Sequence, residues 1–121
     1  MVGIATTRYP PLVQGDEWIF PIAFTEADGT TPINGSGYTL TAQIDWYDDK
    51  IDIDELLDDE NDDRTGILWV NQSQFTFKIK VNEDDTADVP ANIVPRLIVY
   101  YVDTKGDRYT MLIQGLEVLT P

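Results

Sequence analysis

Hydrophobic side chains recur at every second position along much of this chain. In residues 17–24 the even positions all carry large apolar side chains, and a similar alternation runs through residues 38–46 and 75–81. A period of two is typical of a strand with one face in a core, because successive side chains of a strand point to opposite faces. No segment shows a helical period. The sequence therefore predicts an all-β fold.

Turn signals divide this pattern into short strands. Clusters of Gly, Asp, Asn and Ser predict turns in residues 26–37, 71–74 and 104–107. The last turn separates two apolar segments, residues 96–103 and 108–114, and this arrangement predicts a hairpin. Strands at a spacing of roughly ten residues favour an immunoglobulin-like β-sandwich of about seven antiparallel strands, with a small β-barrel as the alternative.

Two residues mark special positions in the pattern. Pro21 has no amide hydrogen to donate, so we expect its strand at a sheet edge or beside a bulge. Asn82 precedes three acidic residues, and we expect it to cap a single helical turn that ends before Pro90.

The length of 121 residues fits one domain. We expect an extended N-terminal arm at residues 1–15, because Pro10 and Pro11 prevent a helix near its middle. A single β-sandwich domain at residues 16–121 follows, with an acidic insertion at residues 45–63.

The arm is apolar and carries one charge. Both packing on its own domain and pairing with the sheet edge of a neighbouring subunit are open for such a segment. Tyr100 and Tyr101 are adjacent on one predicted strand, so one of them must point away from the core. The candidate partner-binding residues are therefore Ile4, Tyr9, Pro10, Pro11, Tyr100 and Tyr101.

The composition removes most familiar catalytic mechanisms. The chain has 22 acidic and 8 basic residues, a formal charge of −14, and neither histidine nor cysteine. It therefore has no thiolate nucleophile, and it lacks the commonest acid–base catalyst and metal ligand of neutral pH. An anionic surface also repels phosphate backbones and anionic lipids. We expect a non-enzymatic protein without a cofactor, which binds neither nucleic acid nor a membrane.

Half of the acidic residues lie in one stretch. Residues 45–63 hold 11 of the 22, while the rest of the chain has 11 acids against 7 bases, a net charge of −4. Asp58, Glu60 and Asp62 supply the alternating oxygens of a calcium loop, but the glycine turn and the closing glutamate of such a loop are missing. The favoured interpretation is a solvated, mobile acidic loop without a metal.

Six segments carry a resemblance to a known family. They are GDEW at 15–18, GSGYTLTAQI at 35–44, FTFKI at 75–79, DDTADVP at 84–90, LIVYYVD at 97–103 and YTMLIQGLEV at 109–118. In their order and content the chain resembles a group of small virion proteins of tailed phages. The group includes domains similar to the N-terminal part of the baseplate upper protein, which attaches receptor-binding proteins to a tail.

This resemblance implies a structural protein of the virion, synthesised in the host cytoplasm. It implies a homo-oligomer that contacts other virion proteins through strand edges, the arm or exposed aromatic residues. The expected function is a tail or baseplate adaptor. One alternative is a capsid decoration or cement protein whose arm clamps capsid subunits. Another, from the charge alone, is an acidic DNA-mimic inhibitor whose clustered carboxylates imitate phosphates.

Overall fold

The computed structural model describes residues 2–4, 10–26, 28, 30–31 and 33–121, and of residues 2–4 the backbone only. Within these ranges the chain is mostly β, with one short α-helix and one 3-10 turn. The strands are β1 (Val2–Ile4), β2 (Leu12–Val13), β3 (Trp18–Glu26), β4 (Thr39–Trp46), β5 (Asp49–Ile53), β6 (Gly66–Asn71), β7 (Thr76–Val81), β8 (Arg96–Val102), β9 (Arg108–Gly115) and β10 (Val118–Leu119). The 3-10 turn η1 is Gln72–Gln74 and the helix α1 is Glu83–Ala87.

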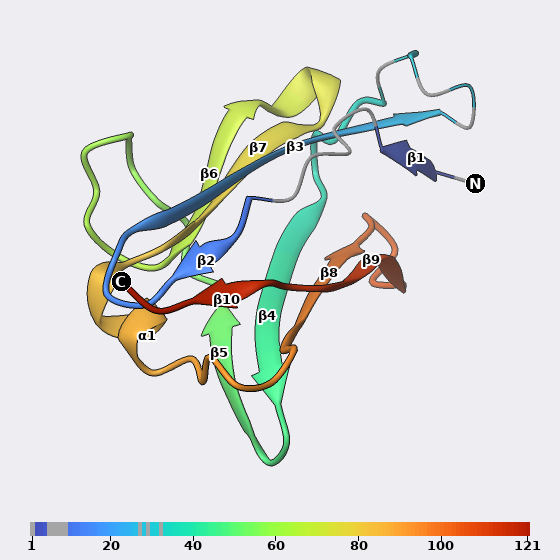
Figure 1. The fold of residues 1–121 in the computed structure, drawn as a ribbon. Coiled ribbons are helices and arrows are strands. Elements are labelled where there is room, and N and C mark those ends of the chain that lie inside the picture. Colours follow the sequence, from blue (N-terminus) through green and yellow to red (C-terminus); the bar gives the residue numbers. More distant parts are fainter. Residues whose placement is uncertain (1, 5–9, 27, 29, 32) are drawn as a thin grey trace.

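The strands form two antiparallel sheets of four, in the orders β1-β3-β7-β6 and β5-β4-β8-β9 (Figure 1). This arrangement confirms a β-rich, sandwich-like fold. The expected antiparallel pairing holds in both sheets, and β2 and β10 differ from it because they form a short parallel pair. That pair joins the segment before β3 to the C-terminal segment, and the amide of Leu12 donates to the carbonyl of Glu117 at 2.8 Å.

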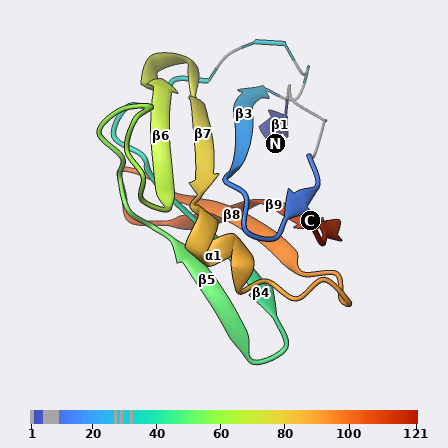
Figure 2. The ribbon, with the colours of Figure 1, turned by 60° about the vertical axis from the view of Figure 1, so that its left-hand side comes forward.

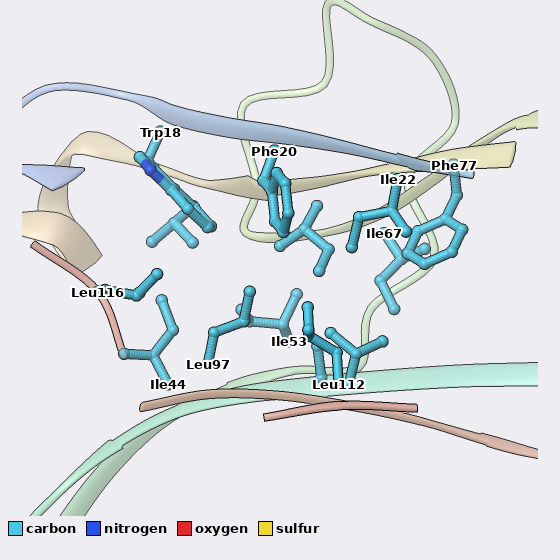
Figure 3. Packing of buried hydrophobic residues seen from close by; sticks show 14 of the residues in the cluster. Trp18, Phe20, Ile22, Ile44, Ile53, Ile67, Phe77, Leu97, Leu112 and Leu116 are labelled. Atoms are coloured by element: carbon cyan, nitrogen blue, oxygen red, sulfur yellow. The ribbon is translucent and has the colours of Figure 1, made fainter. Parts of the chain in front are cut away.

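The core lies between the two sheets. In Figure 3, Trp18, Phe20 and Ile22 point from β3 into the space shared with Ile44 of β4 and Leu97 of β8. All five side chains are buried, as the period of two predicts. Burial of an apolar side chain of this size contributes about 1.5–3 kcal/mol to stability, so the alternating residues account for the packing of the two sheets.

Both special positions behave as the sequence predicts. Pro21 is exposed, and β1 pairs only with residues 24–26 of β3, so within the described part of the chain Pro21 lies on a free sheet edge. The side-chain oxygen of Asn82 accepts a hydrogen bond of 2.9 Å from the amide of Asp85 and caps α1.

The first part of the acidic stretch differs from the expected solvated loop. Residues 49–53 form β5, which pairs with β4 in a hairpin (Figure 2). Ile53 lies opposite Ala42, and both side chains are completely buried. Ile51 and Ile53 face the core side, while Lys50 and Asp52 face outward. The segment therefore has the alternation of a strand, although its composition is acidic.

The described parts of the N-terminal arm pack on their own domain. The backbone of β1 pairs antiparallel with β3, with Ile4 opposite Phe24. The indole Nε1 of Trp18 donates a hydrogen bond of 3.1 Å to the carbonyl oxygen of Pro10. Of the two arrangements left open by the sequence, the structure therefore shows local packing.

Candidate interaction surfaces

The strand β9 forms one edge of the β5-β4-β8-β9 sheet. Among the described residues, it pairs with β8 alone. Natural edge strands are usually protected by charges, prolines or bulges, because their free amide and carbonyl groups can pair with another chain. β9 contains a single charged residue, Arg108, and no proline. Its one irregularity is a bulge at Met111, which lies between the paired residues Thr110 and Leu112.

The outward side chains near this edge are partly apolar. Leu97 and Val99 of β8 are fully buried, so the alternating Ile98 and Tyr100 point to the other face. Ile98 lies opposite Ile113 of β9, whose side chain is 59% exposed. An exposed isoleucine beside half-buried apolar neighbours is an unpartnered apolar surface.

The structure places the two candidate tyrosines on opposite faces. Tyr101 stacks between Tyr38 and Tyr109, with ring centroids 5.0 Å and 5.1 Å away. Burial raises the pKa of the Tyr101 hydroxyl. Tyr100 is the outward member, and the guanidinium of Arg108 covers its ring at 3.8 Å from the centroid. Tyr100 is therefore the tyrosine that belongs to a candidate surface.

Two ion pairs balance the charge on this face. Arg96 and Asp45 contact at 3.1 Å, and Lys50 and Asp52 contact at 3.3 Å. Cross-strand register places Asp45 opposite both Arg96 and Lys50. The outer face of this sheet is consequently close to neutral although the whole chain carries −14.

The acidity concentrates elsewhere, in the loop of residues 54–65 and in α1, which together we name the acidic side. The loop holds seven acidic residues and one base, Arg64. Its end is joined to α1, because the hydroxyl of Thr65 donates to a carboxylate oxygen of Asp85 and accepts from the amide of Asn82 at 2.9 Å. The two acidic segments therefore form one continuous surface.

The loop is fastened to the neighbouring strand by its backbone. The amide of Leu57 donates to the carbonyl of Ile67 at 2.9 Å, and the amide of Ile67 donates to the carbonyl of Glu55 at 2.8 Å. Gly66 permits this approach, since a Cβ atom there would collide with the carbonyl oxygen of Glu55. Residues 55–57 thereby cover the beginning of the β6 edge.

Arg64 organises the carboxylates of the loop. Its guanidinium binds Asp62 at 2.8 Å and lies 3.5 Å from Glu55. The hydrogen bond from this side chain, together with the backbone amides of Asp58 and Arg64, holds the pKa of Asp62 well below its usual range. These hydrogen bonds therefore favour the ionised form of Asp62.

The structure does not bring the three calcium candidates together. Asp62 binds Arg64, and Glu60 binds Lys78 on β7 at 2.9 Å, which lowers the pKa of Glu60. Asp58 is exposed and lies 3.9 Å from Arg64. No group of three metal-ligating side chains suited to an ion occurs in the part of the chain that the structure describes.

The structure describes only part of the four candidate residues in the arm. Tyr9 lies outside the described residues, and only the backbone of Ile4 is described. The carbonyl of Pro10 is occupied by Trp18, while Pro11 is exposed. Among the four arm candidates, Pro11 is therefore the one that the structure describes as exposed.

Sequence reasoning missed Arg108 and Ile113 as surface residues. A signal was available, because Met111, Leu112 and Ile113 are three consecutive apolar residues. A strand cannot turn three successive side chains toward one core, so such a run predicts an exposed apolar residue or a bulge. The structure contains both.

The comparisons with known proteins give no family. No protein-family model matches the sequence, and no curated protein matches it. Among the helices formed by the described residues, none has the length and hydrophobicity needed to cross a bilayer.

Proposed function

We propose that this chain is a non-enzymatic structural protein of a tailed-phage virion, a tail or baseplate adaptor that joins tail parts through subunit contacts. Its scaffold in this proposal is an immunoglobulin-like sandwich. The resemblance of the sequence to small virion proteins of tailed phages motivates the assignment, and two packed sheets of four strands support the scaffold.

The observation that carries the proposal is the separation of two unlike surfaces. The β9 edge contains no acidic residue, whereas the acidic side has seven acids in one loop. In Figure 1 the turn between β8 and β9 lies at the right, and the long loop after β5 lies at the left with α1. An adaptor needs two such surfaces, so that one partner does not exclude the other.

The two surfaces suit different partners. A single-sign patch attracts a basic surface from a distance and raises the rate of encounter. An apolar, unprotected strand edge binds through backbone pairing, which depends little on side-chain charge. We therefore assign the acidic side to a basic virion protein and the β9 edge to a second contact.

The alternatives have less support. A cement protein would clamp its neighbours with the arm, but the described parts of the arm pair with β3 and β10 of the same chain. A DNA mimic needs free carboxylates in a rigid row. Here Asp62 and Glu60 are bound to Arg64 and Lys78 instead.

Purified phage particles that carry an epitope-tagged copy of this chain test the proposal. Density for the protein at the tail or baseplate in a reconstruction is the expected result. Density on the capsid, or absence of the tagged chain from intact particles, contradicts it.

A pair of charge variants tests the acidic side. Asp54 and Asp58 are exposed in the loop, and D54N/D58N is expected to reduce incorporation into particles. E26Q/D48N removes the same charge at exposed positions outside both the acidic side and the β9 edge, and serves as the control. Equal incorporation of the two variants would show that the acidic side has no role in binding.

A further inference from the structure

The contact surface at β9 has a charge pattern that suits one particular partner. A chain with a net charge of −14 repels copies of itself, so two copies can meet only where acidic residues are scarce. The segment 108–115 has no acidic residue, and the turn before it contains Asp103 and Asp107 beside the bases Lys105 and Arg108. On the outer face of the same sheet, Asp45 and Asp52 are both paired with bases. Within β9 itself, no acidic side chain therefore opposes the approach of a second copy.

The two charged residues at the ends of this edge have opposite signs. Arg108 begins β9, and Glu117 follows its last residue by two positions. Glu117 is exposed, and neither residue has an ion-pair partner within the described ranges. The ring of Tyr100 holds the Arg108 guanidinium in place from one side.

A two-fold axis brings these opposite charges together. When an edge strand pairs antiparallel with its own copy, the beginning of one strand lies beside the end of the other. Arg108 of each copy would then lie near Glu117 of the other. Ile113 is beside the middle of segment 108–117, so the two Ile113 side chains would lie close to the axis.

We propose that two copies of this chain associate antiparallel through their β9 edges, with Ile113 at the centre and Arg108 of one copy near Glu117 of the other. This inference rests on the proposed assembly function and supplies its second contact. It joins the two four-stranded sheets that contain β9 into one continuous sheet of eight strands, in which the two exposed Ile113 side chains lie beside each other on the outer face.

Sedimentation velocity of the purified chain over a wide concentration range tests the association. We expect the wild-type chain to form a dimer, and Ile113→Glu to weaken it at least about tenfold, because a carboxylate would be placed at the centre of the contact. Val70→Glu is the matched control, because Val70 is 55% exposed on β6 of the other sheet. It should dimerise like the wild type.

A charge exchange tests the antiparallel register. Arg108→Glu and Glu117→Lys are each expected to weaken the dimer, and R108E/E117K is expected to restore it, because the pair is re-formed with its signs reversed. Urea unfolding of each variant confirms that the monomer stays folded. A wild-type chain that stays monomeric, equal effects of Ile113→Glu and Val70→Glu, or no recovery in the double variant each overturns the inference.

The same variants separate this inference from the proposed function. A monomeric chain that still enters phage tails, and loses that ability on Ile113→Glu, would show that β9 binds another virion protein and would overturn self-pairing alone. A β9 dimer that is absent from intact particles would instead overturn the adaptor function and leave the self-pairing intact.

Discussion

The indole Nε1 of Trp18 donates a hydrogen bond of 3.1 Å to the carbonyl oxygen of Pro10. This bond crosses the turn between the arm and β3, and it fixes the arm just before β2. Since β2 pairs with β10, the bond also helps to hold the C-terminal strand in place.

Trp18→Phe should therefore loosen the pair of strands β2 and β10. The variant keeps an aromatic ring in the core but removes the donor, and loss of one hydrogen bond costs about 0.5–1.5 kcal/mol. Hydrogen exchange at the amides of Leu12 and Gln14, which donate to carbonyls at the C-terminal end, should become faster. Trp46→Phe is the control, because Trp46 lies far from the arm in sequence on β4. Unchanged exchange in Trp18→Phe would show that the bond to Pro10 does not help to hold β2.

Ile53 tests whether the beginning of the acidic stretch belongs to the core. Its side chain is completely buried, and Ile53→Ala is expected to lower the free energy of unfolding by about 2–5 kcal/mol in urea titrations. Leu56 lies three residues later and is 61% exposed, so Leu56→Ala should change stability by only about 0.5 kcal/mol or less. Similar values for the two variants would contradict the strand assignment of β5.

The burial of Ile53 in β5 also changes how the acidic stretch can be tested. Deletion of residues 48–63 removes the whole of β5 and with it the buried Ile53. Such a deletion would disturb the fold and the acidic side together. Substitution of exposed loop carboxylates by amides keeps the strand and changes only the charge.

Thr86 joins the helix to the start of β3. Its hydroxyl donates to the carbonyl of Asp16 at 2.8 Å and accepts from the amide of Gly15 at 3.1 Å, and the residue is fully buried. Thr86→Val keeps the shape but leaves both backbone groups without this partner, so it should cost about 1–3 kcal/mol in urea unfolding. Thr86→Ser retains the hydroxyl and should recover most of this loss. A valine variant as stable as the serine variant would show that water replaces the hydroxyl.

The strands could be predicted where the alternation of the sequence is regular. Phe20 and Ile44 fall on the buried faces that their positions predict, because the direction of a side chain in a strand follows from its position alone. The sequence did not predict β5, because Asp49 and Asp52 make the segment resemble a solvated loop. The spacing of Ile51 and Ile53 nevertheless has the period of two that is typical of a strand.

The partners of the strands could not be predicted in the same way. The parallel pairing of Leu12 with Val118 joins residues more than a hundred positions apart, and no local pattern specifies it. The candidate surface at β9 has the same origin. Ile113 is on the outer face of β9, and the place of β9 at the edge of its sheet is a property of the whole fold.

The pH dependence of stability should report the contact between Arg64 and Asp62. The pKa of Asp62 lies well below its usual range in the folded protein, chiefly because of the Arg64 side chain. Its ionised form therefore stabilises the fold above the ordinary carboxyl pKa of about 4, and this contribution is lost as the pH falls toward the folded pKa. Arg64→Ala should lower the free energy of unfolding near neutral pH, and the difference from the wild type should shrink below about pH 4.

The carboxyl carbon resonance of Asp62 gives the direct measurement, and in Arg64→Ala its midpoint should move up toward the ordinary value. Asp28 provides an internal reference. Its pKa is lowered to about 2 by the hydroxyl and amide of Thr31 and by the amide of Thr30, without any contribution from Arg64. Asp28 should therefore titrate unchanged in the variant. A parallel shift of both resonances would indicate general unfolding in acid, whereas an unshifted Asp62 would show that the backbone amides of Asp58 and Arg64 alone hold its charge.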